Sequence, residues 1–204
     1  MVATTESGGT RGSGRGATQG EIGRYGPVAM ALHWATALAI LLLLGTALLM
    51  QPLTEGGSTR APLLALHISL GVTVLALTVI RLVWRLTHRP PTLPAGMPGW
   101  EKVMARIVHT LFYILLLAVP LGGYVVASLH PNSAGIVWFG LAELPGLPPP
   151  PDGNGAMVAD RVADGHRTLG LILATLAALH IAAALKHHFV SKDGVLARMW
   201  PFGR

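Results

Sequence analysis

Of the 204 residues, 51% are hydrophobic and only 12% carry a charge, against roughly a quarter in ordinary soluble domains, which is typical of an integral membrane protein. The formal net charge of +6 does not indicate nucleic-acid binding, because the basic residues flank apolar runs and no aromatic-basic groove motif is visible. The chain has no cysteine, which excludes disulfides, iron–sulfur clusters and haem attached through a Cys-x-x-Cys-His motif.

Residues 1–24 are rich in Gly, Thr, Ser and Arg and have almost no bulky apolar side chains. We expect them to form a disordered cytoplasmic tail, because so little apolar surface cannot offset the entropy lost on folding. They do not resemble a signal peptide, since no short apolar stretch precedes a small-residue cleavage site. Residues 25–201 are expected to form one transmembrane domain, and 202–204 a short C-terminal tail.

Four apolar runs predict an all-α, integral membrane four-helix bundle with spans at about 28–50, 63–84, 107–129 and 166–190. Each of the first three is about 33 Å long as a helix, enough to cross a hydrocarbon core of about 30 Å. The fourth is long enough if its polar ends are counted. The connecting segments contain turn-forming Gly and Pro, and the longest, 130–164, is expected to include a short interfacial element around Ile136–Leu141.

The orientation of the bundle follows from its Lys and Arg residues. Twelve of the fifteen lie in the tail, around the second loop and in the C-terminal segment. The opposite face keeps only Arg60, Arg161 and Arg167. By the positive-inside rule both termini are cytoplasmic, and the acidic third loop faces the periplasm of a Gram-negative bacterium. We therefore expect a multi-pass protein of the bacterial cell inner membrane, in contact with lipid.

Five histidines lie in or at the edge of the spans: His33, His67, His109, His166 and His180. Ionisable residues inside a membrane are expensive and usually functional. Judged by depth, His33 and His180 share a layer near the cytoplasmic face, whereas His67 and His166 share one near the outer face. The 14 residues from His166 to His180 span about 21 Å and end about 40° short of four full turns, so one helix can serve both layers.

Each layer offers two imidazoles from facing helices, the arrangement that holds a b-type haem in a helix bundle. The residue four positions after each of these histidines is small, which would leave room for a flat macrocycle: Ala37, Gly71, Gly170 and Ala184. Small residues also serve close packing of membrane helices, and this is the alternative interpretation. His109 is followed by the bulky Tyr113 and is the poorest candidate for an iron ligand.

Other polar residues near the layers are candidates for contacts to a cofactor. Arg81, in the last turn of the second span, needs an anionic partner or a path to the interface, and a haem propionate would supply the former. His109 is either a hydrogen-bond partner of a propionate or quinone, or a bridge to a neighbouring helix. Lys186, His187 and His188 suit propionates or quinone carbonyls, or else form a solvated basic helix end.

Several motifs surround these histidines: Ala31-Leu32-His33-Trp34, Pro62-Leu63-x-x-x-His67-x-x-x-Gly71, Arg81-Leu82-x-x-Arg85-Leu86, His166-x-Thr168-Leu169, Leu179-His180-x-Ala182-Ala183-Ala184-Leu185-x-His187-His188 and Lys192-Asp193-x-x-Leu196-x-Arg198-Met199. In this combination the chain resembles the bacterial cytochrome b561 family, the small four-helix di-haem membrane proteins that include superoxide oxidase. The resemblance covers residues from about Tyr25 to Pro201. Only the tails lie outside it.

The resemblance implies two haem b groups with axial pairs His33–His180 and His67–His166, in agreement with the depth argument. It also implies an oxidoreductase that oxidises superoxide to dioxygen on the outer side and passes the electrons to ubiquinone. Arg60 and Arg167 flank the outer ligands, and we expect them to attract the superoxide anion. At Arg167 and Lys186 the chain departs from the family pattern, in which an acidic and a small residue are expected.

Two other classes of function compete with this one. The chain could be the membrane anchor and electron conduit of a larger dehydrogenase or hydrogenase complex with a soluble redox partner protein. The compact loops and the lack of a fifth span weigh against that. A metal or proton transporter with a histidine relay would explain neither the two layers nor the small residues, and the spans lack Asp and Glu.

Overall fold

The computed structural model describes residues 23–54, 57–93, 96–131 and 135–201. The predicted tails at 1–24 and 202–204 therefore lie outside the described residues, except for Gly23 and Arg24. Four long helices dominate: α1 (Pro27–Met50), α2 (Arg60–Thr87), α3 (Gly99–Leu129) and α4 (Gly155–Lys186). Two short strands, β1 (Ile136–Trp138) and β2 (Ala142–Leu144), and two short helical turns, η1 (His187–Ser191) and η2 (Ala197–Met199), complete the described part.

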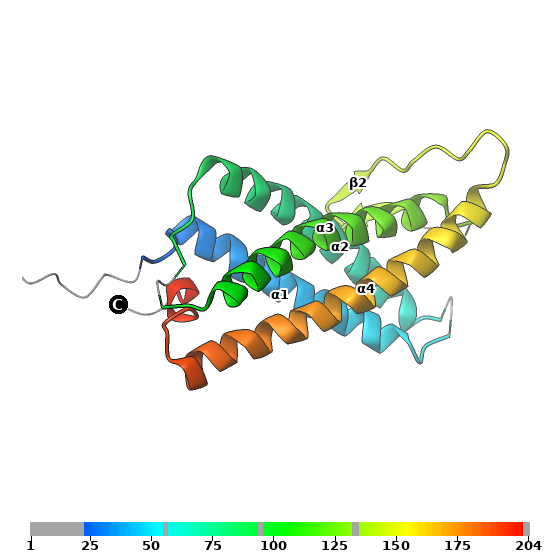
Figure 1. Cartoon of the computed structure of the whole chain (residues 1–204). Coiled ribbons are helices and arrows are strands. Elements are labelled where there is room, and N and C mark those ends of the chain that lie inside the picture. The colour runs from blue at the N-terminus through cyan, green and yellow to red at the C-terminus, as the bar shows by residue number, and fades with distance from the viewer. Residues whose placement is uncertain (1–22, 55–56, 94–95, 132–134, 202–204) are drawn as a thin grey trace, which may run out of the picture.

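Helices α1 to α4 each have the length and the apolar composition needed to cross a membrane. Their outer faces carry exposed large apolar side chains, such as Leu41 and Leu48 on α1 and Leu171 on α4. A soluble protein rarely exposes so much apolar surface. In a membrane this surface contacts lipid tails, which are equally apolar, so its exposure carries no free-energy penalty. The predicted four-helix membrane bundle is confirmed in this respect (Figure 1).

The bundle interior is narrow and contains residues from every helix. Its buried apolar centre combines Ala39 of α1, Val74 of α2, Leu116 of α3 and Leu173 of α4, among others. Buried hydroxyls are also present, and each donates to a carbonyl one turn earlier on its own helix, as Thr78 does to Val74 at 2.7 Å. The helix ladder thus satisfies polar groups that water cannot reach.

The two ends of the described chain meet at one end of the bundle (Figure 1). The amide of Tyr25 donates to the carbonyl of Arg198 at 3.2 Å. The buried Arg198 guanidinium donates to the carbonyls of Gly23 at 2.7 Å and Thr92 at 2.5 Å. The N-terminal segment, the α2–α3 loop and the C-terminal segment are therefore tied together, and the compartment that this end faces stays a prediction.

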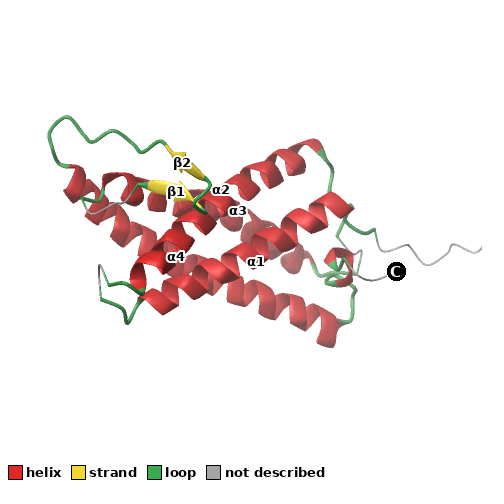
Figure 2. Ribbon diagram, turned by 180° about the vertical axis from the view of Figure 1, so that it is seen from behind, coloured by secondary structure: helices red, strands yellow, loops and turns green. Residues whose placement is uncertain are grey.

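The short element expected around residues 136–141 is a β-hairpin beside α2 (Figure 2). Its turn has positive φ at Phe139 (49°) and Gly140 (72°), as a type I′ turn requires at both central residues. The strained Phe139 is held by its amide, which donates to Ser69 Oγ at 3.0 Å. Trp138 also donates to Thr73 Oγ1 at 3.1 Å, so the hairpin is anchored on α2.

Helices α3 and α4 extend well beyond the predicted apolar spans. α3 begins at Gly99 rather than near Ile107, and α4 begins at Gly155 rather than near His166. The added turns are amphiphilic, so a search for apolar runs finds only the lipid-embedded part of each helix. His166 consequently lies about three turns inside α4 rather than at its start.

Candidate functional site

The structure brings together the two residues of the outer pair predicted from depth. His67 on α2 and His166 on α4 face each other with ring centres 6.1 Å apart and planes at 78°. Both side chains are half-buried. The two imidazoles converge on the space between α2 and α4.

Hydrogen bonds fix which nitrogen of His67 is available to a ligand. The Thr46 hydroxyl donates to the Leu43 carbonyl at 2.8 Å, and it lies 2.9 Å from His67 Nδ1. A hydroxyl has one proton to donate, so its oxygen accepts from His67 Nδ1–H. The Nε2 lone pair of His67 is thereby left for a metal, in the second-shell arrangement common to metal-binding histidines.

His166 is oriented in the same way by a backbone group. Its Nδ1 lies 2.9 Å from the carbonyl oxygen of Val119 on α3, which can only accept, so Nδ1 carries the proton and Nε2 is free. Gly123, one turn further along α3, is packed against this ring, since a Cβ there would lie 3.0 Å from His166 Cε1. Glycine at 123 therefore makes space for the imidazole.

The inner pair is His33 on α1 and His180 on α4, which face each other. The ring centres of His33 and His180 are 6.4 Å apart, with planes at 72°. Nδ1 of His33 is buried and has no hydrogen bond to any residue that the structure describes. Trp34 packs edge-on against the His33 ring at 5.5 Å.

His109, which the sequence argument set aside, also belongs to the inner layer. Its ring centre lies 5.7 Å from that of His180, and its Nδ1 donates to the Ala105 carbonyl at 2.5 Å. The residues that follow His109 in sequence do not predict that it lies near His180, because this depends on how closely α3 and α4 pack. The inner layer thus contains three imidazoles: His33, His109 and His180.

The separation of the rings fits an iron with two axial imidazoles. Two metal–nitrogen bonds of about 2 Å each place the ring centres about 6 Å apart, and the observed values are 6.1 and 6.4 Å. Space is present beside the outer ligands as well, since a Cβ added at Gly71 or Gly170 would meet nothing within 4 Å. The residues present therefore fit a bis-histidine haem in each layer.

Arg81 lies beside the inner layer. Its guanidinium is 6.0 Å from the centre of the Tyr113 ring, and it lies near His33, His109 and His180. A cation held among aromatic and imidazole rings at this depth favours an anionic partner. A haem propionate has the required charge and reach.

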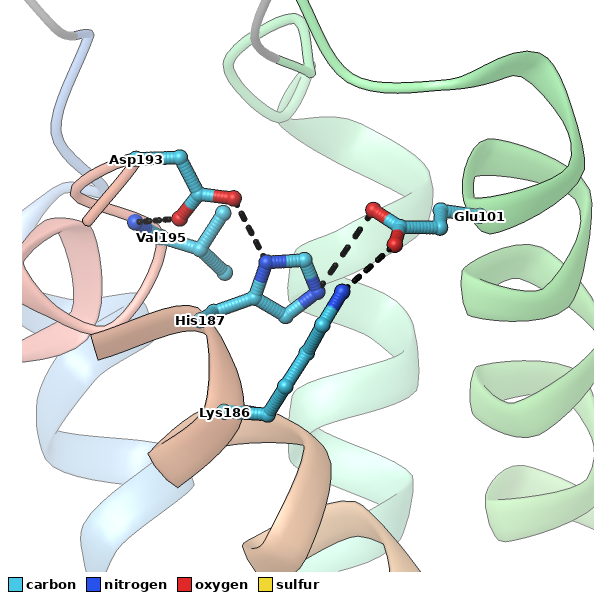
Figure 3. A network of polar contacts seen from close by, with 5 residues as sticks. All are labelled: Glu101, Lys186, His187, Asp193 and Val195. Atoms are coloured by element: carbon cyan, nitrogen blue, oxygen red, sulfur yellow. Dashed lines mark hydrogen bonds and ion pairs between the residues drawn. The ribbon is translucent and has the colours of Figure 1, made fainter. Parts of the chain in front are cut away.

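Lys186 and His187 belong to a polar network at the end of the bundle where the termini meet (Figure 3). Lys186 Nζ lies 2.7 Å from Glu101 Oε1. His187 Nδ1 lies 2.5 Å from Asp193 Oδ2. His188, by contrast, is exposed and packs against Phe189, so the two adjacent histidines have different surroundings.

The two arginines expected to attract an anion lie at the other end of the bundle. Arg167 follows His166, and its exposed side chain pairs with Asp164 at 3.8 Å. Arg60 starts α2 and donates to the Leu53 carbonyl at 3.4 Å. Each guanidinium therefore has an acceptor of its own near the outer pair of histidines.

Membrane-spanning helices with facing imidazole pairs define the class of integral membrane haem proteins. Comparison with known proteins gives the family: residues 24–202 match the model of the prokaryotic cytochrome b561. The chain belongs to the prokaryotic cytochrome b561 family, whose members are membrane electron-transfer proteins with haem b.

Individual relatives support this assignment. Cytochrome b561 homolog 2 of Escherichia coli K12 is 31% identical over 179 residues, which cover 86% of this chain and 90% of the relative. Cytochrome b561 homolog 1 of the same organism is 28% identical, with 87% and 97% covered. A protein of Yersinia pestis named probable superoxide oxidase CybB is 27% identical, with 87% and 96% covered.

Proposed function

We propose that the chain is a di-haem cytochrome of the bacterial inner membrane that carries electrons from superoxide on the outer side to ubiquinone on the cytoplasmic side. The observation that carries the proposal is the two sets of facing imidazoles in two layers along one helix, α4. An electron carrier needs cofactors near both faces, and this arrangement supplies a site for each.

His67 and His166 would hold the outer haem, and His33 and His180 the inner one. The bound haems supply the one-electron redox chemistry. Thr46 and Val119 hold the outer imidazoles in the tautomer that leaves Nε2 free. Because His166 and His180 stand about 21 Å apart along α4, the two sites divide the thickness of the bilayer into shorter steps.

Superoxide as the electron source rests on the probable superoxide oxidase among the relatives. The proposed role of Arg60 and Arg167 is to raise the local concentration of this anion next to the outer site. Oxidation of superoxide to dioxygen releases one electron and no proton. No general base is therefore required at the outer end.

Ubiquinone is proposed at the inner end, where polar side chains are available to bind carbonyls or propionates. Arg81 and His109 lie beside the inner pair. Lys186, His187 and His188 lie nearer the end of the bundle. We assign Arg81 to a propionate because it carries a fixed charge. His109, Lys186, His187 and His188 are assigned to hydrogen bonds with a quinone or a propionate.

The alternative is an electron conduit in a larger dehydrogenase or hydrogenase complex. Its Arg60 and Arg167 would then contact a protein rather than superoxide. Co-purification of the chain with a soluble redox subunit, together with no response to superoxide, would favour this alternative.

The test is ubiquinone reduction by the purified, haem-loaded protein with superoxide as the only electron source. We expect ubiquinol to form in proportion to protein and to cease when superoxide is removed by added dismutase. His166→Ala is the matched control, because it should break the electron path at the outer site without affecting the inner pair. If the wild-type haems stay oxidised in superoxide, the proposed electron source is wrong.

A further inference from the structure

His187 belongs to a network of polar contacts with Glu101, Lys186 and Asp193 (Figure 3). The imidazole stands between two carboxylates, with Asp193 Oδ2 2.5 Å from Nδ1 and Glu101 Oε2 4.0 Å from Nε2. The side chains of His187, Glu101 and Asp193 are only 14%, 11% and 23% exposed. Asp and Glu side chains are mostly exposed in proteins, and those that are not are usually paired.

The backbone positions Asp193 beside His187. The helix widens into a π-helical turn at His187–Ser191, and Lys192 adopts a left-handed conformation with φ 50° that reverses the chain. Oδ1 of Asp193 then accepts from the Val195 amide at 3.2 Å, which leaves Oδ2 for the imidazole. Turns of this π type often mark functional sites.

Glu101 is held from the opposite side. Lys186 Nζ binds Glu101 Oε1 at 2.7 Å and leaves Oε2 directed at His187. Because 4.0 Å exceeds hydrogen-bond distance, Nε2 of His187 is not tied to Glu101 and can exchange a proton with another group. The charged groups that face the imidazole are thus Glu101 from α3, and Lys186 and Asp193 from its own end of the chain.

A cavity connects this network to the surface. It has a volume of about 500 Å³ and is lined by Gly96, Met97, Pro98, Glu101, Lys186, Ser191 and Asp193. Both carboxylates therefore border space that water can occupy, and His187 is not among the residues that line it. A proton entering from the cavity would therefore meet Glu101 or Asp193 first.

The network is aligned with the inner histidines. His187 is seven residues after His180 on the same helix, which places it about 10 Å further along and almost on the same face. Glu101 precedes His109 on α3 by about two turns. The packing of α3 on α4 that brings His109 to His180 thus also brings Glu101 to His187.

We propose that Glu101, His187 and Asp193 form a proton relay that supplies the quinone reduced at the inner end, an inference that rests on the proposed function. Each quinone takes two electrons, delivered one at a time from two superoxide anions, and two protons. Glu101 passes a proton from cavity water to Nε2 of His187, whose Nδ1–H already donates to Asp193, and the imidazolium so formed gives the Nε2 proton to a quinone oxygen. Asp193 orients the ring. The balance is one quinone, two superoxide anions and two protons giving one quinol and two dioxygen molecules.

The test uses full-length protein with the haems reduced by dithionite and then mixed with a short-chain ubiquinone, while haem absorbance and a pH dye are recorded. We expect Glu101→Gln to slow haem reoxidation and proton uptake together by at least about tenfold. Added imidazole or another small weak acid should restore both rates. Glu143→Gln, on the exposed hairpin at the other end, is the matched control and should react like wild type.

The outcomes separate the relay from the function on which it rests. If ubiquinone does not reoxidise the wild-type haems, the proposed function fails and the relay fails with it. If the wild type reacts but Glu101→Gln and Asp193→Asn react equally fast, the relay alone is wrong. If Glu101→Gln reacts slowly, has unchanged haem spectra and no weak acid restores its rates, Glu101 has a structural role. That result would also overturn the relay.

Discussion

Replacing His67 by alanine is expected to lower the haem content from two haem b per chain to one. His67 and His166 are the only imidazoles that face each other in the outer layer of the described chain, so loss of one would leave a single imidazole to hold a haem there. The inner pair shares no hydrogen bond with this site. The haem-to-protein ratio and the reduced α-band of purified protein should show that the inner haem is retained.

Milder variants test the same outer site without removing a ligand. Thr46→Val removes the oxygen that accepts from His67 Nδ1 and should lower the affinity of the outer site for haem by about 10- to 100-fold.

Gly123→Ala adds a Cβ 3.0 Å from His166 Cε1, whereas Gly122→Ala places one no nearer than 3.7 Å to any neighbour. Outer haem should therefore be lost from Gly123→Ala and kept by Gly122→Ala, and equal losses would contradict the assigned geometry.

Replacing His33 by alanine is expected to remove only the inner haem, although His109 lies even nearer to His180. The ring centres are 6.4 Å apart for His33 and 5.7 Å for His109, so distance alone does not choose the ligand. The choice of His33 follows from the small Ala37 one turn later, against Tyr113 one turn after His109. His109→Ala should accordingly keep both haems.

The two variants give opposite results under the two assignments. Haem content and redox titration of His33→Ala and His109→Ala, measured side by side, decide between them. Loss of the inner haem from His109→Ala, with retention in His33→Ala, would transfer the ligand role to His109. Loss of both haems from each variant in well-folded protein would remove the support for two separate layers.

The membrane bundle was predictable from sequence because hydropathy and helix length alone determine which segments can cross a bilayer. The polar first turns of α3 and α4 were not predictable in this way, since they form helix outside the apolar core. The hairpin at residues 136–144 also escaped detailed prediction. Its strands are three residues long and depend on contacts with Ser69 and Thr73 on α2.

The candidate site was partly predictable for a similar reason. Depth along known spans groups His67 with His166 and His33 with His180, and the structure brings the members of each group face to face. Depth does not reveal which helices pack closely, so the approach of His109 to His180 was missed.

Partners on other elements could not be read from sequence at all. Thr46 and Val119 meet the outer imidazoles through packing of α1 and α3 against the ligand-bearing helices. The contact of Asp193 with His187 depends on a π-helical turn and a left-handed residue, Lys192. No local sequence rule predicts such a reversal, because it requires the rest of the bundle to hold it.

We propose that four histidines in two layers hold two haems, and this can be tested directly. The most direct measurement is the amount of haem b per chain in wild-type protein made with adequate haem, together with the reduced absorption spectrum. We predict two haem b per chain and α-bands from two sites. One haem per chain, or none, in well-folded protein would contradict it.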